Sequence, residues 1–201
     1  MARTRLHPAT RKNQILKATK DLIELKGYQK LTVPEIVKSA GISQGSFYRF
    51  FKNIDDAVIA LIKGEIFPAV QQATAHLDFR PVKSSLDLEI VLFDWFRNLG
   101  QQIAQNSILI REVLTVIPYS GGEAAAEINR FIENVRGLGE QILEAVSGAE
   151  PFRKVNSKII SHAVVGMVIG ASIQAATEGL DVITWAQEIA KFEAGGLVNH
   201  G

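Results

Sequence analysis

Apolar residues recur at helical spacing along nearly all of this 201-residue chain, and no segment shows the sustained alternation of a β-strand. On the first periodic segment, one face carries Ile15, Thr19, Leu22 and Ile23. The six prolines and most of the glycines stand near the ends of such segments. The pattern predicts an all-α protein.

Start and stop signals set the expected helix boundaries. Thr32 and Glu35 form the pattern of a capping box at the start of a short second helix. Ser43 and Asn53 are favourable N-caps for the third and fourth helices, and Pro68 predicts an interruption or kink in the fourth. We expect helices near residues 9–26, 33–40, 44–51, 54–76, 85–105, 107–117, 123–146, 153–178 and 181–193.

Composition narrows the class of protein. Hydrophobic residues make up 47% and charged residues 21%, so the chain can bury a sizeable core, which excludes a disordered protein. The absence of cysteine excludes disulfides, iron–sulfur clusters and cysteine-bearing zinc sites. The first thirty residues contain no apolar run of a signal peptide, so we expect a cytoplasmic protein.

One apolar stretch, residues 159–176, approaches the length of a membrane span. It contains polar residues such as Ser161 and Gln174, and Lys158 and Glu178 flank it closely. We therefore expect a helix that is buried in a helical bundle, and no membrane as a partner.

Charge is distributed unevenly along the chain. The net charge of +1 combines +8 over residues 1–54, where 11 Lys and Arg face 3 acidic residues, with −7 over residues 55–201. A basic head on an acidic body indicates a polyanionic partner for the head alone.

The basic head contains the run TVPEIVKSAGISQGSFYRFF, residues 32–51, which predicts two short helices joined by a tight turn. Helical spacing in the second helix directs Phe47, Phe50 and Phe51 inward. Its outer face carries Gln44, Gly45, Tyr48, Arg49 and Lys52. A polar face of this kind fits the major groove of double-stranded DNA, so the run predicts a helix-turn-helix.

The outer face divides into groups that read bases and groups that bind phosphates. Gln44 and Arg49 can present hydrogen-bonding groups to base edges, and Gly45 permits a close approach. Tyr48, Thr32 and Lys52 are better placed to bind phosphates. Phosphate contacts position a protein on DNA without reading its sequence.

Residues 11–61 resemble the DNA-binding domain of the TetR family of transcriptional regulators. The resemblance is carried by Ile15-Leu16, Ala18, Gly27-Tyr28, Thr32-Val33, Ile36-Val37, Ala40-Gly41-Ile42-Ser43, Gly45-Ser46-Phe47-Tyr48 and Phe51. It implies a three-helix DNA-binding domain over residues 1–53 and a helical effector-binding and dimerisation domain over residues 54–201. It further implies a homodimer built on the last two long helices. The expected DNA contacts are Thr32, Ser43, Gln44, Gly45, Ser46, Tyr48, Arg49 and Lys52.

Two positions depart from the family pattern. The family usually has a phosphate-binding lysine at the start of the fourth helix, where this chain has Ile54, and often a polar residue where Phe50 stands. We expect Lys52 to compensate for the first departure. Ahead of the first helix, Arg3 and Arg5 form an arm that can enter a minor groove, although an unstructured terminus is the commoner outcome.

The C-terminal body offers candidates for an effector pocket and a dimer interface. Aromatic walls with a few polar groups are typical of small-molecule cavities, and the candidates are Trp95, Phe96, Arg111, Tyr119 and His162. Arg111 is the strongest of these because a charge in an apolar segment needs an anion or a path to solvent. Small residues that allow another helix to approach closely are Ala163, Gly166, Gly170 and Ala171.

The sequence predicts no catalytic residue, no metal site and no cofactor. Residues 41–45 match the Gly-x-Ser-x-Gly pattern of a nucleophile elbow, but that motif requires a preceding strand, and none is expected here. The four histidines show no metal-binding spacing, and there is no phosphate-binding glycine run.

We therefore expect a homodimeric, ligand-responsive repressor that binds a palindromic operator in double-stranded DNA and responds to an unidentified small molecule. Two alternatives remain open at this point. The body of such a regulator can instead bind a protein partner or no effector, and a small helical enzyme using Ser43 is a further alternative.

Overall fold

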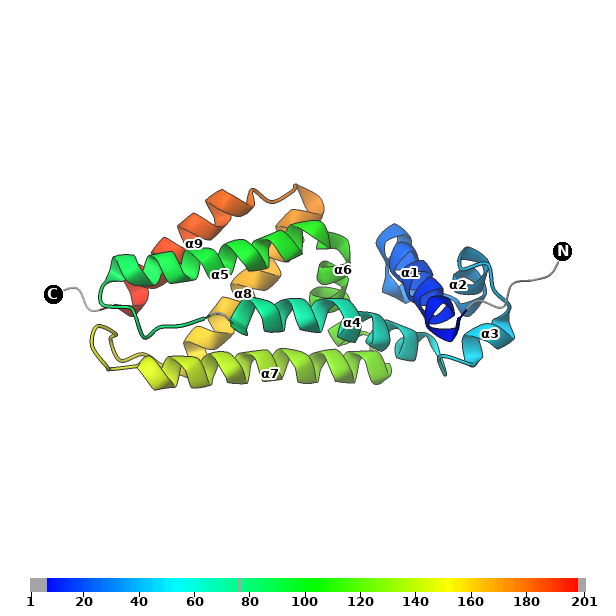
Figure 1. Cartoon of the computed structure of the whole chain (residues 1–201), viewed down its shortest axis with the longest axis horizontal. Coiled ribbons are helices and arrows are strands. Elements are labelled where there is room, and N and C mark those ends of the chain that lie inside the picture. Colours follow the sequence, from blue (N-terminus) through cyan, green and yellow to red (C-terminus); the bar gives the residue numbers. More distant parts are fainter. Residues whose placement is uncertain (1–6, 76, 199–201) are drawn as a thin grey trace. The chain divides into compact units, whose positions relative to one another are not determined.

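The structure, a computed structural model, describes residues 7–75 and 77–198. Within these residues every regular element is a helix, and the β contacts amount to one isolated antiparallel bridge between Phe152 and Val198 (Figure 1). The prediction of an all-α protein is confirmed. Arg3 and Arg5, the expected minor-groove arm, lie outside the described residues.

The helices follow one another with short connections. Their bounds are α1 Pro8–Lys26, η1 Tyr28–Lys30, α2 Val33–Ser39, α3 Gln44–Tyr48, α4 Ile54–Ala75, α5 Ser85–Gln105, α6 Ser107–Arg111, the π-helical turn η2 Glu112–Val116, the 3₁₀ turn η3 Ile117–Tyr119, α7 Gly122–Val146, α8 Ser157–Thr177 and α9 Val182–Leu197.

Several boundaries differ from those expected. The recognition helix α3 ends at Tyr48 rather than near residue 51, and α4 continues through Pro68 without an interruption. The helix expected over 107–117 is instead divided into α6, η2 and η3, since Pro118 has no backbone N–H with which to continue it. The start of α8 is set by Asn156, whose side chain accepts a hydrogen bond from the Ile159 N–H at 3.1 Å.

The predicted caps are confirmed at two of three helix starts. The Ser43 hydroxyl accepts a hydrogen bond from the Ser46 N–H at 3.3 Å, and the Asn53 side chain accepts one from the Asp56 N–H at 2.8 Å. The predicted capping box is wrong for Thr32, because its hydroxyl donates to the Glu35 carboxylate and caps no amide. That carboxylate also pairs with a lysine of α1, which lowers its pKa.

The described chain forms two compact units. The first contains the residues up to Phe67 together with Glu112–Asn129, and the second contains Pro68–Arg111 and the residues from Arg130 onward. Both units are therefore discontinuous in sequence, and α4 and α7 each begin in the first unit and end in the second. The functional boundary expected after residue 53 does not coincide with this division and remains a prediction.

The core of the first unit is small and partly aromatic. Ile15 of α1, Ile36 of α2 and Phe47 of α3 are fully buried against one another, and Phe51 and Ala57 complete the cluster. These contacts hold the two short helices α2 and α3 against the longer α1, since a helix as short as α3 is not stable by itself.

A hydrogen-bonded group, here called the Tyr28 cluster, consists of Tyr28, Asp55, Glu112 and Ala124 and also lies within the first unit. The Tyr28 hydroxyl donates to Asp55 at 2.6 Å, and the Tyr28 N–H donates to the buried Glu112 carboxylate at 2.9 Å. The second Asp55 oxygen accepts from the Ala124 N–H at 3.2 Å. The cluster thus joins η1 to the starts of α4 and α7 and to η2.

Asp55 satisfies an amide that a helix start leaves without an intrahelical partner, because Ala124 stands in the first turn of α7. The close approach depends on Gly122. A Cβ atom at that position would lie 2.6 Å from an Asp55 oxygen, and its φ of +82° also favours glycine.

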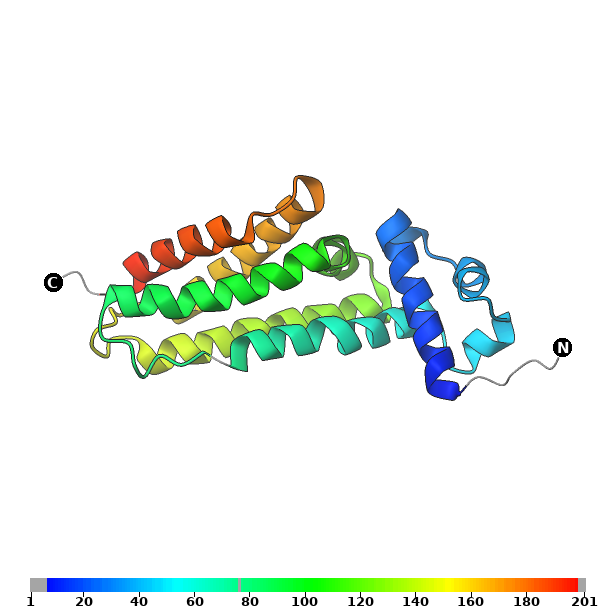
Figure 2. The same ribbon diagram turned by 45° about the horizontal axis from the view of Figure 1, so that its top comes forward.

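In the second unit, α5 lies along α9 (Figure 2). Its core joins Leu88 and Phe96 of α5 to three fully buried alanines of α9, Ala186, Ala190 and Ala194. The two helices approach closely at Gly100, where a Cβ atom would lie 3.1 Å from the Trp185 ring.

The expectation that residues 159–176 form a buried helix is wrong. By length and composition α8 is apolar enough to cross a membrane, but only 17% of its most apolar window is buried in the described chain. Gly166 and Gly170 are exposed, as are Ile159 and Ile173. Phe192 of α9 is 73% exposed as well.

We predict that Tyr28→Phe lowers the free energy of unfolding by about 1–3 kcal/mol, because it removes a hydrogen bond to a charged carboxylate. Urea titrations followed by circular dichroism would measure the change. Tyr48→Phe is the matched control, because the Tyr48 ring is 53% exposed.

The free energy of unfolding should also fall at alkaline pH, because the Tyr28 hydroxyl ionises there. Burial, with a contribution from Asp55, raises the pKa of Tyr28 from 10.0 to about 12. Its contribution is complete below pH 10 and is lost as the pH rises through 12. The loss of stability between these values should be smaller in Tyr28→Phe; an identical loss in both proteins would contradict this role.

Candidate DNA interface and effector cavity

The outer face of α3 is open to solvent, as a DNA-reading face requires. Gln44, Gly45, Tyr48 and Arg49 are all exposed, while Phe47 on the opposite side of the helix is fully buried. The Tyr48 ring stands edge-on to the Phe47 ring with centroids 5.5 Å apart. The buried phenylalanine therefore fixes which side chains the helix presents.

Gly45 lies at the centre of this face. A Cβ atom added there would meet no heavy atom of the described residues within 4 Å, and the backbone of Gly45 has no positive φ. Packing within the chain therefore gives no reason for glycine at this position. A close approach by an external partner would give one.

Phe50 supports the guanidinium that was predicted to read bases. The Phe50 ring is half-buried against the core of the first unit, and the Arg49 guanidinium lies 5.5 Å from its centroid. Ile54 packs against the same core. Phe50 thus packs inward as its helical spacing predicted, and Ile54 has a packing role that the sequence did not predict.

The cations of this face are available for an external anion. Arg49 and Lys52 are exposed and form no ion pair with any described residue. By contrast, Lys17 pairs with Asp21 at 2.9 Å and Lys20 with Glu65 at 2.6 Å. Part of the positive charge of the head is thus neutralised within the chain, but that of the recognition face is not.

The other predicted DNA contacts surround α3. Thr32 is exposed at the start of α2, and Ser43 is exposed at the N-cap of α3. Ser46 is half-buried, with its hydroxyl oxygen 3.0 Å from that of Ser43. The backbone N–H of Lys52 donates to Asp56 at 3.0 Å, which holds the turn that precedes α4.

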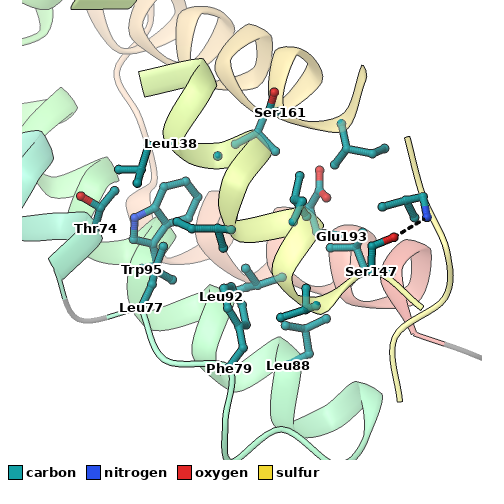
Figure 3. Close-up of a pocket in the computed structure, with 18 of the residues that line it drawn as sticks. Thr74, Leu77, Phe79, Leu88, Leu92, Trp95, Leu138, Ser147, Ser161 and Glu193 are labelled. Atoms are coloured by element: carbon teal, nitrogen blue, oxygen red, sulfur yellow. Dashed lines mark hydrogen bonds between the residues drawn. The ribbon is translucent and has the colours of Figure 1, made fainter. Parts of the chain in front are cut away.

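The second unit contains a cavity of about 130 Å³ (Figure 3). Side chains from the C-terminal part of α4 and from α5, α7, α8 and α9 line it, and almost all of them are apolar. The lining residues include Val70, Leu77, Phe79, Leu88, Leu92, Trp95, Phe96, Val135, Leu138, Ile142, Val146, Phe152, Ile160, Val164 and Leu197.

Two of the five predicted effector residues, Trp95 and Phe96, line this cavity, and three do not. Arg111 is half-buried at the end of α6. Tyr119 is 85% exposed and belongs to the first unit. His162 is exposed, and its Nδ1 lies 2.7 Å from the Lys158 carbonyl oxygen. Sequence spacing could not show which of the five candidates line the cavity, because helices that are distant in the sequence form it only when they pack together.

The cavity contains few polar groups. Trp95 Nε1 is buried and has no hydrogen-bond partner among the described residues. The Ser147 hydroxyl accepts from the Val155 N–H at 3.0 Å, and the Ser161 hydroxyl donates to the Lys158 carbonyl at 3.1 Å. Glu193 of α9 is only 8% exposed, and burial raises the pKa of its carboxyl group.

Sequence analysis overlooked Glu193, although a signal was present. Its spacing from Ala190, Ala194 and Leu197 places it on the buried stripe of α9. A glutamate on such a stripe is unusual, since carboxyl groups are seldom buried without a partner.

The nucleophile-elbow pattern has no structural support. Residues 41–45 follow helix α2, and Ser43 serves as the N-cap of α3, so the strand that the motif requires is absent from this part of the chain. No group of three or more potential metal-ligating side chains occurs among the described residues.

Comparison with known proteins finds a match to a family profile in the N-terminal part and a relative that is similar over nearly the whole chain. Residues 15–61 match the profile of bacterial regulatory proteins of the tetR family. The fatty acid metabolism regulator protein of Bacillus subtilis (strain 168) is 40% identical over 187 residues, which cover 92% of this chain and 89% of that protein.

Solved structures share the fold at lower identity. NalD, the secondary repressor of the MexAB-OprM multidrug efflux pump in Pseudomonas aeruginosa, gives a TM-score of 0.77 at 18% identity, covering 97% of this chain and 100% of NalD. FadR from Bacillus subtilis in complex with stearoyl-CoA gives 0.70 at 20% identity, covering 92% of this chain and 98% of FadR.

These matches confirm the predicted class of protein, a transcriptional regulator with a helix-turn-helix DNA-binding domain, and the prediction that it is not an enzyme. The similarity to the Bacillus subtilis regulator extends over nearly the whole of both chains. The chain belongs to the TetR family of bacterial regulatory proteins.

Proposed function

We propose that this regulator is a homodimeric repressor whose affinity for a palindromic operator falls when a long-chain fatty acyl ligand occupies the cavity of the second unit. The observation that carries the proposal is the cavity itself, to which five helices contribute lining residues and which is lined almost entirely by apolar side chains. An acyl chain needs a site of that kind, because its methylene groups can be removed from water only against other apolar groups.

Two relatives support the choice of ligand class. The relative that is 40% identical is named a fatty acid metabolism regulator, and the FadR structure with the same fold was solved with stearoyl-CoA. A regulator with no effector, or with a protein partner in its place, is less favourable. It would leave Trp95 Nε1 buried without a partner and would leave the Glu193 carboxyl, in a side chain that is 8% exposed, without a hydrogen bond from the described residues.

The exposed surface of α8 and α9 supports the proposed dimer. Ile159 and Phe192 are more than half exposed, and this apolar surface is unfavourable in water unless a second copy covers it. Gly166 and Gly170 stand one turn apart on α8, and no heavy atom of the described residues would lie within 4 Å of a Cβ there. A second α8 could thus approach closely.

DNA recognition then follows from the symmetry of the dimer. Two copies of α3 would enter successive major grooves about 34 Å apart on a palindrome. Gln44 and Arg49 would read base edges, while Tyr48, Thr32 and Lys52 would contact phosphates.

The Tyr28 cluster gives a route by which a ligand can act on the DNA-binding helices. α4 and α7 contribute lining residues to the cavity from their C-terminal parts, and both helices are hydrogen-bonded through Asp55 at their N-terminal ends. A ligand that displaces either helix would therefore act on Asp55 and Tyr28. Ligand binding and DNA binding are then coupled, and each weakens the other by the same factor.

The recognition face can be tested with a palindrome selected from random duplex DNA by the purified protein. Arg49→Ala should cost about 1–3 kcal/mol and relax sequence preference, whereas Lys52→Ala should weaken binding to all sequences and reduce the salt slope by about 1. Lys17→Ala is the control, because Lys17 is paired with Asp21. Unchanged affinity and preference in Arg49→Ala, measured by fluorescence anisotropy, would refute the assignment.

The dimer interface can be tested with two matched glycine variants. Gly166 and Gly64 are both exposed helical glycines, and no described heavy atom would lie within 4 Å of a Cβ at either. Gly166→Arg should convert the dimer to a monomer in sedimentation equilibrium, and Gly64→Arg should leave it a dimer. Dimers in both variants would show that the interface lies elsewhere.

The ligand class can be tested with palmitoyl-CoA and the selected palindrome. Saturating palmitoyl-CoA should weaken DNA binding by about 5- to 150-fold, and coenzyme A alone should have no effect. If DNA affinity stays the same although palmitoyl-CoA binds, the ligand is not an effector. If palmitoyl-CoA does not bind, the proposed ligand class is wrong.

A further inference from the structure

Glu193 is the one buried charged residue among those that line the cavity. It is 8% exposed and stands on α9 between Ala190 and Ala194, which are fully buried. Figure 3 draws its carboxylate among the lining side chains, which are otherwise largely apolar. Leu or Ala would fill this position at no cost in desolvation, so the carboxyl group calls for an explanation.

No other group of the described chain satisfies this carboxyl. Glu193 forms no hydrogen bond or ion pair with a described residue, and burial is the sole cause that raises its pKa. The other charged residue that lines the cavity, Arg153, is exposed and forms no ion pair with it. The hydroxyl groups of Ser147 and Ser161 are engaged with the backbone.

We propose that Glu193 positions the polar end of the ligand by donating a hydrogen bond from its protonated carboxyl group to the carbonyl oxygen of an acyl thioester. The inference rests on the proposed function, since it concerns the polar end of the same ligand.

The chemistry follows from the charge of each group. A buried carboxyl without a cationic partner is favoured in its neutral form, in which it has one O–H donor. A thioester carbonyl is a neutral acceptor and satisfies that donor. A fatty acid anion would instead bring an unpaired charge into an apolar cavity that has no buried cationic side chain among its lining residues, which is costly.

Trp95 Nε1 adds a second donor that lacks a partner in the described structure. The unsatisfied groups that line the cavity are thus two donors when Glu193 is protonated. Figure 3 draws Trp95 and Glu193 on different sides of the cavity, so one acceptor does not serve both. An uncharged acceptor at the end of an apolar chain matches the protonated Glu193, whereas an organic cation would match only its ionised form.

The test compares the binding of palmitoyl-CoA and palmitate by isothermal titration calorimetry to four proteins: wild type, Glu193→Gln, Glu193→Leu and Glu188→Gln. Glu188 is an exposed glutamate of α9 that does not line the cavity, so its variant is the matched control. Leucine keeps the volume but removes the donor, and glutamine keeps a donor but cannot ionise. Circular dichroism checks that each variant is folded.

We expect Glu193→Leu to bind palmitoyl-CoA about tenfold more weakly than wild type, since it loses one hydrogen bond in an apolar site. Glu193→Gln should bind palmitoyl-CoA nearly as well as wild type, because it keeps a donor, and palmitate should bind each protein more weakly than palmitoyl-CoA because its charge has no partner in the cavity. Glu188→Gln should match the wild type with both ligands.

Equal affinity of wild type and Glu193→Leu for palmitoyl-CoA would overturn the role of Glu193 and leave the proposed function intact. Equal losses of palmitoyl-CoA affinity in Glu193→Gln and Glu193→Leu would do the same, since a donor at this position would then not matter. If the wild type bound neither ligand, the role of Glu193 and the proposed ligand class would both be wrong.

Discussion

Tyr28 donates one hydrogen bond from its hydroxyl to Asp55 and another from its backbone N–H to the buried Glu112. Asp55 in turn accepts from an amide in the first turn of α7. Because these bonds join η1, α4, η2 and α7, the orientation of α1 to α3 in the first unit depends on segments that continue into the second.

The parts of this arrangement that depend on local sequence could be predicted. Ser43 and Asn53 cap their helices as their residue types favour, and the spacing of Phe47, Gln44 and Arg49 sorted α3 into a buried and an exposed face. Thr32 shows the limit of such rules. The capping pattern predicts that the Thr32 hydroxyl accepts from a backbone amide. It donates instead to the Glu35 carboxylate, which also pairs with Lys26 of α1.

The parts that depend on distant segments could not be predicted in this way. The apolar pattern of α8 is the same whether its face is covered by the same chain or by a second copy, so its exposure was not foreseen. Arg111, Tyr119 and His162 have the residue types of a pocket, but packing places them outside the cavity. The cavity draws on five helices, so the sequence could place Glu193 on the apolar stripe of α9 but not in a cavity.

In the proposed function, the cavity and the DNA-binding face are coupled through the Tyr28 cluster. The most direct measurement is the factor by which saturating palmitoyl-CoA changes the affinity for a selected palindrome, determined for wild type and for Asp55→Asn. We expect palmitoyl-CoA to reduce the DNA affinity of the wild type clearly and to change that of Asp55→Asn by a factor near one. Both proteins should still bind palmitoyl-CoA and the palindrome. An equal factor in the two proteins would contradict this coupling.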